Sequence, residues 1–118
     1  MNSDELKART KQFALRVMRL VEALPRTITG RAIGNQLVRS GTSVGANYRA
    51  ACRGRSKAEF AAKIGTVAEE ADESCFWMEL IVEGHLLSPE QVQPLLDEAN
   101  ELTAIFTSAT KTARDGDR

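Results

Sequence analysis

Apolar residues recur every three or four positions in four segments of the chain, with polar residues between them. This spacing places the apolar side chains on one face of an α-helix. The predicted helices span residues 4–24, 29–53, 56–84 and 89–112, followed by a polar tail at 113–118 that we expect to fray. Short connections between amphipathic helices predict one all-α domain, an up-down-up-down antiparallel four-helix bundle.

Several helix ends carry recognisable signals. Ser56 with Glu59 has the spacing of a capping box, in which each side chain satisfies a free amide at the start of a helix. Ser88 with Gln91 repeats that spacing before the fourth helix. Gly54 is expected to take the left-handed conformation that commonly ends a helix.

The second predicted helix is rich in glycine, at positions 30, 34, 41 and 45. Each interior glycine costs about 1 kcal/mol relative to alanine, so four of them indicate a specific requirement. Either the helix breaks near residues 40–43, or small residues let another backbone approach closely. We favour a continuous or kinked helix.

A polar seam is predicted on the inward faces of the second and third helices. Ser40 and Asn47 belong to the second helix and Ser74 to the third, with Glu73 beside it. Buried polar groups are almost always hydrogen-bonded, so we expect these side chains to bond to each other or to helix carbonyls. Such a network can fix the register of the helices.

Composition agrees with a helical protein. Aromatic residues make up 5% of the 118 residues and there are three prolines, which favours helices over a β-sandwich or barrel. The formal net charge is zero, so the whole molecule has no bulk attraction for nucleic acid or membrane. The first 25 residues carry no apolar run typical of a signal peptide, and no stretch approaches a membrane span. We therefore expect a cytoplasmic protein, without membrane association, whose two cysteines stay reduced.

Charge is nevertheless segregated along the chain. Residues 26–63 hold eight basic side chains and one acid, whereas residues 64–110 hold ten acids and no Lys or Arg. Three interpretations stay open: the basic segment binds phosphates, it meets the acidic face of another subunit, or both faces are merely solvated. The candidate anion-binding residues are Arg39, Arg49, Arg53, Arg55 and Lys57.

Catalytic and metal-binding patterns are missing from the sequence. The single histidine, His85, has Val82 rather than a glutamate three residues before it, so the Glu-x-x-His pair of di-metal bundles is absent. The stretch from Gly34 to Gly41 is not followed by Lys-Ser or Lys-Thr, so it is not a phosphate-binding loop. One histidine does not supply a nucleophile-activating triad. The sequence predicts no catalytic residue, no metal and no cofactor, and hence a protein that is not an enzyme.

A set of spaced motifs resembles a known family. These motifs are QLVRS at 36–40, SVGANYR at 43–49, RGRS at 53–56 and EADES at 70–74, followed by Trp77. Together they are similar to the 23S rRNA intervening-sequence proteins, and the similarity extends over nearly the whole chain. Some members of that family are encoded within intervening sequences of bacterial 23S rRNA genes.

The resemblance implies a compact bundle that assembles as a ring-like homopentamer. A related group resembles the accessory variability determinant of diversity-generating retroelements, a basic pentamer that binds nucleic acid and a reverse transcriptase. The expected function is a non-enzymatic, homo-oligomeric accessory or scaffold protein, with copies of itself, RNA or DNA, and a reverse transcriptase or other protein as partners. The alternative is a protein–protein interaction module whose charged faces serve only oligomer assembly.

Overall fold

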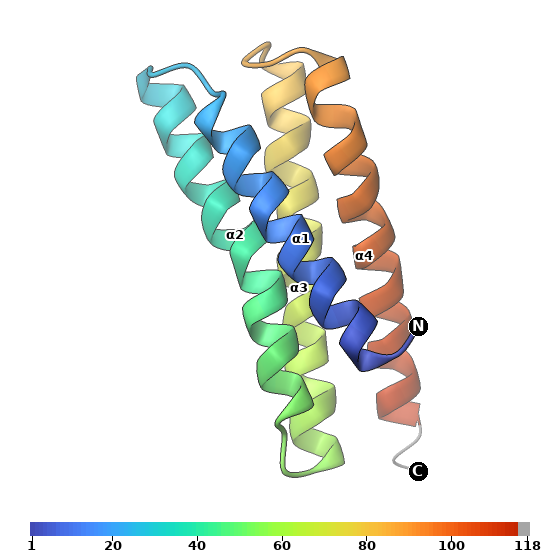
Figure 1. Ribbon diagram of the computed structural model, residues 1–118. Helices are drawn as coiled ribbons and strands as arrows, with labels where there is room; N and C mark the ends of the chain where they lie inside the picture. Colours follow the sequence, from blue (N-terminus) through green and yellow to red (C-terminus); the bar gives the residue numbers. More distant parts are fainter. Residues whose placement is uncertain (116–118) are drawn as a thin grey trace.

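A computed structural model describes residues 1–115, and these form four helices (Figure 1). No strand occurs within that described range. The helices are α1 (Ser3–Glu22), α2 (Ile28–Cys52), α3 (Lys57–Glu83) and α4 (Pro89–Asp115). Their ends fall within three residues of the predicted ones. The largest difference is in α4, which continues through residues 113–115, where a frayed tail was expected; residues 116–118 lie outside the described range.

Successive helices lie side by side and antiparallel, which confirms the up-down-up-down arrangement (Figure 1). The pairs α1–α2, α2–α3 and α3–α4 pack extensively, and α1 and α4 contact each other more lightly. The backbones of the diagonal helices stay apart in the described residues, and α2 reaches α4 only through side chains such as Tyr48. The bundle measures 48 × 23 × 20 Å. The start of α1 and the α2–α3 turn therefore lie toward the same end of the molecule (Figure 1).

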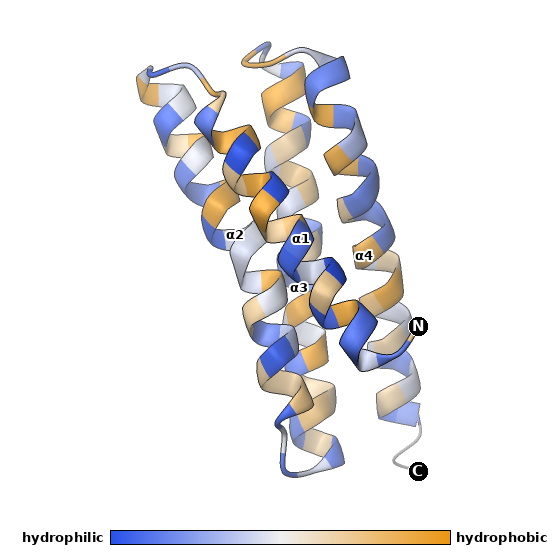
Figure 2. Cartoon of the chain, in the orientation of Figure 1, coloured by the Kyte–Doolittle hydropathy of each residue, from blue (hydrophilic) through white to orange (hydrophobic). Residues whose placement is uncertain are grey.

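The core follows the predicted apolar faces. Figure 2 shows hydrophobic and hydrophilic residues alternating along each helix at the spacing of its turns. Fully buried aromatic rings come from α1 and α4, as Phe13 and Phe106. The Phe106 ring also packs at a tilt against Tyr48 of α2, with 5.3 Å between the ring centroids. Tyr48 lies one residue outside the predicted seam. The neighbouring glycines at 41 and 45 widen the buried face of α2 beyond a narrow stripe, because they bring it close to α1.

The glycine-rich α2 is continuous from Ile28 to Cys52, so the alternative of a break near residues 40–43 is wrong. Three of its glycines face α1 at close range. A Cβ on Gly41 would lie 2.8 Å from two methyl carbons of Val17, one on Gly34 would lie 3.2 Å from Val21, and one on Gly45 would lie 3.4 Å from Thr10. Helix pairs approach to a distance set by the side chains at their contact, so these glycines let α1 and α2 pack closely.

The predicted caps are present, with two corrections. Ser56 accepts a hydrogen bond from the Glu59 amide and Ser88 accepts one from the Gln91 amide. Gln91 also accepts from the Ser88 amide, which completes that capping box, whereas Glu59 accepts from the Arg55 amide in place of the Ser56 amide. Gly54 does not take the left-handed conformation, so that prediction is wrong. Instead, the amides of Arg53 and Gly54 donate to the carbonyls three residues before them, at 3.1 and 3.0 Å. These bonds end α2 without a residue of positive φ.

The left-handed position falls instead at the end of α3, on a histidine. His85 has φ of 57°, and the amides of His85 and Leu86 donate to the carbonyls of Val82 and Ile81. This pair of bonds is the Schellman arrangement, in which glycine normally holds the left-handed position. Gly84 marks this helix end in the sequence, but it lies one residue before the left-handed position and has φ of −84°.

Candidate functional site

A groove of about 590 Å³ runs between α1 and α2, and four basic side chains line it. Lys7 and Lys11 come from α1, and Arg49 and Arg53 come from α2. The other lining residues are neutral: Ala8, Ala14, Thr42, Gly45 and Ala46. We call this feature the basic groove.

The cations of the basic groove have no acidic partner among residues 1–115. Among the residues that the structure describes, ion pairs form at Arg9 and Arg39 and at none of the four groove cations. Lys11, Arg49 and Arg53 are exposed and Lys7 is half-buried. Four uncompensated positive charges around one concave surface focus a positive potential that attracts anions.

Two other candidates lie at this end and are exposed: Arg55 in the α2–α3 turn and Lys57 as the first residue of α3. Neither lines the groove. The start of α3 is already capped by the protein itself. Glu59 accepts a hydrogen bond from the Arg55 amide at 2.9 Å, and Ser56 accepts one from the Glu59 amide at 3.1 Å. An anion at this turn would therefore compete with these two side chains for the amides that a free helix N-terminus offers.

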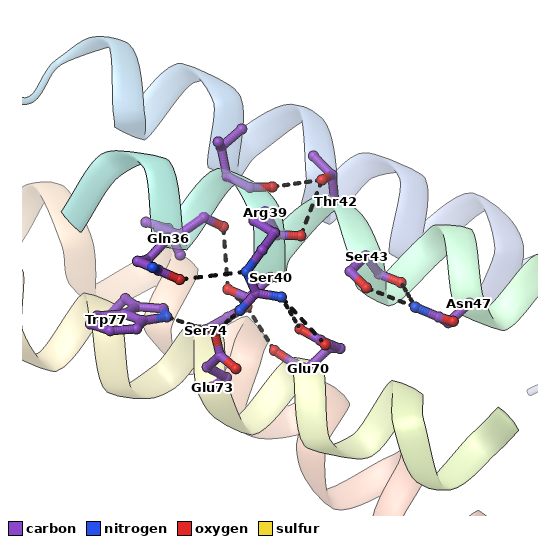
Figure 3. A network of polar contacts seen from close by, with 12 residues as sticks. Gln36, Arg39, Ser40, Thr42, Ser43, Asn47, Glu70, Glu73, Ser74 and Trp77 are labelled. Carbon is purple, nitrogen blue, oxygen red and sulfur yellow. Dashed lines mark hydrogen bonds and ion pairs between the residues drawn. The ribbon is translucent and has the colours of Figure 1, made fainter. Parts of the chain in front are cut away.

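Arg39 lies ten residues before Arg49, about 15 Å away along the axis of α2, on the side next to α3. It pairs with Glu70 at 3.2 Å and with Glu73, both on α3 (Figure 3). Glu73 also accepts a hydrogen bond from the Trp77 indole at 3.0 Å. The structure thus separates Arg39 from the other candidate cations and surrounds it with carboxylates, which neutralise its charge.

The predicted polar seam divides into two parts. Ser40 and Ser74 are both fully buried, and their hydroxyls are 2.9 Å apart between α2 and α3. Ser74 also bonds to the Glu70 carbonyl of its own helix. Asn47 does not join this pair, because its amide donates to the carbonyl and hydroxyl of Ser43 one turn back (Figure 3). Glu73 lies outward, beside Arg39.

Acidic residues occupy the outward face of α3. Asp72, Phe76 and Glu79 are exposed and share that face at helical spacing, and the Phe76 ring is 51% exposed. The acidic and basic surpluses therefore lie on different helix pairs. Trp77 is half-buried and packs against the hydrophobic core, and its ring centroid is 5.1 Å from that of Phe76 in an edge-on contact.

Buried titratable groups in the bundle are held in their neutral forms. Burial, with the nearby charges of Asp72 and Glu79, raises the pKa of the Cys75 thiol, although a hydrogen bond with Thr103 opposes the shift. Burial and its neighbour Cys52 raise the pKa of Tyr48 to about 12. Neither group is placed to act as a base or nucleophile near neutral pH.

Sequence reasoning missed Lys7 and Lys11 as members of the site. Their spacing of four residues places both on one face of α1, which was the available signal.

Within residues 1–115, no three His, Cys, Asp or Glu side chains lie close enough to hold a metal ion together. Over the same range, none of the helices has the length and apolarity needed to cross a membrane.

The fold and the groove define a class: an all-α, antiparallel four-helix-bundle protein with a cationic surface groove. The family model of the 23S rRNA-intervening sequence proteins matches residues 4–108, and the chain belongs to this family. A crystal structure from Bacteroides thetaiotaomicron, described as a protein with unknown function from the S23 ribosomal protein family, is similar over 95% of this chain and 100% of that one, with a TM-score of 0.86 and 30% identity. No protein with a curated description matches the chain.

Proposed function

We propose that this chain is a non-enzymatic accessory or scaffold protein that associates with RNA or DNA through the basic groove and assembles with copies of itself in the cytoplasm. The observation that carries the proposal is the convergence of Lys7, Lys11, Arg49 and Arg53 around one groove without a carboxylate among its lining residues. Phosphates bound by such cations release counterions, which is the main source of sequence-independent affinity for nucleic acid.

The intervening-sequence family takes its name from the segments of 23S rRNA genes that encode some of its members, and that name does not itself specify a binding partner. Arg55 and Lys57 extend the positive surface beyond the groove along the same end of the bundle. Arg39 has no part in this interface, because Glu70 and Glu73 neutralise it. The proposal includes a homopentamer and a reverse-transcriptase partner because the resemblance to the family implies them.

The test is binding of labelled RNA and DNA at several salt concentrations, with two double variants of equal charge. Arg49→Gln with Arg53→Gln removes half of the groove cations. Arg16→Gln with Arg19→Gln removes two arginines that lie beside α4 and line no part of the basic groove. The first pair should lose most of the affinity and reduce the salt dependence, and the second should retain both. Absence of binding by the unmodified protein at low salt would overturn the proposal.

The second candidate function is a protein–protein interaction module in which the charged faces serve assembly alone. The exposed Phe76 ring between Asp72 and Glu79 favours it, because an aromatic residue within a charged surface is typical of contact sites. Solution mass separates the two functions. If Arg49→Glu with Arg53→Glu breaks the oligomer and the unmodified protein binds no nucleic acid, the charges serve assembly.

A further inference from the structure

The walls and floor of the basic groove have distinct chemistry. On each wall, two cations are separated by four residues, which places them about 6 Å apart along the helix axis. Lys7 and Lys11 form one row and Arg49 and Arg53 form the other. Because α1 and α2 are neighbours, the two rows face each other across the groove.

The floor between these rows is made of small neutral groups from both helices, including Ala8, Gly45 and Ala46. The close contact of Gly45 with Thr10 and of Gly41 with Val17 keeps the helices near each other. Axes of packed helices lie about 8–10 Å apart, so the gap between the two rows is narrow. A double helix is wider than the spacing of two packed helices and cannot lie between the two rows as a whole. One sugar–phosphate backbone is narrow enough to lie within it.

The lining also lacks the groups that recognise bases by stacking. None of the groove residues is aromatic, whereas single-strand-binding proteins commonly stack successive bases on aromatic rings. The hydroxyl of Thr42 already donates to the Val38 carbonyl at 2.6 Å within α2. The remaining interactions are contacts between cations and phosphates and van der Waals contacts with the floor.

From this arrangement we infer that the basic groove takes one nucleic-acid strand by its phosphodiester backbone, with the phosphates between the two rows of cations and the bases directed away. The inference rests on the proposed function and narrows it from nucleic acid in general to single strands, bound without base selection. Four cations set an upper limit of about four phosphate contacts, so log affinity should fall against log salt with a slope of about −3 or shallower.

The decisive experiment fills the groove without changing its charge. Ala46→Leu adds a larger apolar side chain to the floor, at an exposed position where the helix tolerates leucine. The matched control is Ala32→Leu, on an exposed position of the same helix that lies outside the groove. Fluorescence anisotropy with labelled oligothymidylate, oligouridylate and a hairpin duplex measures affinity, and circular dichroism checks that each variant stays folded.

We expect Ala46→Leu to weaken oligothymidylate and oligouridylate binding by about tenfold or more. The leucine side chain should hold the phosphodiester backbone of the strand away from the groove cations. Ala32→Leu should leave single-strand affinity unchanged, and the hairpin should bind more weakly than either strand and respond little to Ala46→Leu. Equal single-strand affinity in Ala46→Leu and the unmodified protein would overturn the inference while leaving the proposed function intact. Tighter binding of the duplex would do the same.

Two further outcomes also count against the inference. In the first, the Ala46→Leu variant no longer forms the oligomer, while its affinity for single strands stays the same when the protein is diluted. That result would show that the groove holds a second copy of the chain. Failure of the unmodified protein to bind any of the three nucleic acids at low salt would overturn the proposed function itself, which distinguishes that failure from a failure of the single-strand inference.

Discussion

Gly41 of α2 lies directly against Val17 of α1, so closely that a Cβ on the glycine would be 2.8 Å from both methyl carbons of the valine. Val17 is fully buried and β-branched, so its side chain has little freedom to move aside. This contact sets the distance between the two helices whose outer edges form the basic groove.

Gly41→Ala should lower the free energy of unfolding by about 1 kcal/mol, because overpacking costs about 1–3 kcal/mol and the gain in helix propensity returns about 1. Gly65→Ala is the matched control. Its Cβ would meet only Thr110 at 3.8 Å, so this variant should gain about 0.5–1 kcal/mol. Urea unfolding at equal protein concentration measures both changes. A gain in stability for both variants would contradict the close-contact account.

The buried Ser40–Ser74 pair should show coupling in a double-mutant cycle. Each hydroxyl keeps a carbonyl of its own helix as a partner, so either single alanine variant should cost only about 1 kcal/mol. The double variant should cost less than the sum of the two, by about 0.5–1.5 kcal/mol. Ser40→Ala combined with Thr66→Ala is the control, since Thr66 bonds only within α3, and it should be additive. Additive costs for both combinations would show that the serines do not act as a pair.

His85 holds the left-handed position that ends α3, at φ of 57°. His85→Gly should raise the melting temperature and stabilise the protein by about 1 kcal/mol, because a side chain in this conformation is strained by about 1–2 kcal/mol. Gly84→Ala should do the opposite, since its Cβ would lie 2.8 Å from the Leu80 carbonyl oxygen. Thermal unfolding followed by circular dichroism compares the two neighbours, and equal melting temperatures would refute this description of the helix end.

Cys75 should be protected from thiol reagents while Cys52 reacts. Cys75 is 3% exposed and its thiol is within hydrogen-bonding distance of Asn100 and Thr103, whereas Cys52 is half-buried. Cys52→Ser leaves Cys75 as the sole thiol, and its labelling at about pH 8 should proceed only as fast as the protein unfolds. Rapid labelling of Cys75 in the folded protein would contradict its burial.

The same thiol makes stability depend on pH in the alkaline range. The pKa of Cys75 is raised in the folded protein above its ordinary value of 9.0, so the folded state holds the proton more tightly than the unfolded state. Its contribution to stability is complete below that value and is lost as pH rises above it. Cys75→Ala should therefore flatten the alkaline decline in the free energy of unfolding relative to the unmodified protein.

Arg9 and Glu98 link α1 to α4, where the bundle packs most lightly. Two parallel hydrogen bonds of 2.8 and 2.7 Å join them, and their side chains are 23% and 16% exposed. Glu98→Gln should lower the free energy of unfolding by about 1 kcal/mol at low salt and by less at high salt. Glu101→Gln removes a longer contact of 3.4 Å to the same arginine at a more exposed position and should have a smaller effect. Equal effects of the two substitutions would argue against the paired geometry.

Much of this architecture was predictable from the sequence, because helices are local structures. The three-to-four spacing of apolar residues and the Ser56 and Ser88 capping boxes locate the helices within a few residues. The polar positions of Ser40 and Ser74 on inward faces predict that they need partners. The prediction of a left-handed Gly54 was wrong because it used local sequence alone. Whether a helix ends in a left-handed residue depends on the path that the chain follows after the helix.

The site depended on tertiary structure, because its two walls are about forty residues apart in the chain. In the sequence, Lys7 and Lys11 do not differ from other pairs of exposed lysines. Only the packing of α1 beside α2 places them opposite Arg49 and Arg53. Arg39 carries the same charge as those arginines, yet its place against α3 gives it two carboxylate partners. Periodicity along a helix determines which face is buried, whereas the packing of helices decides which charges meet and which remain free.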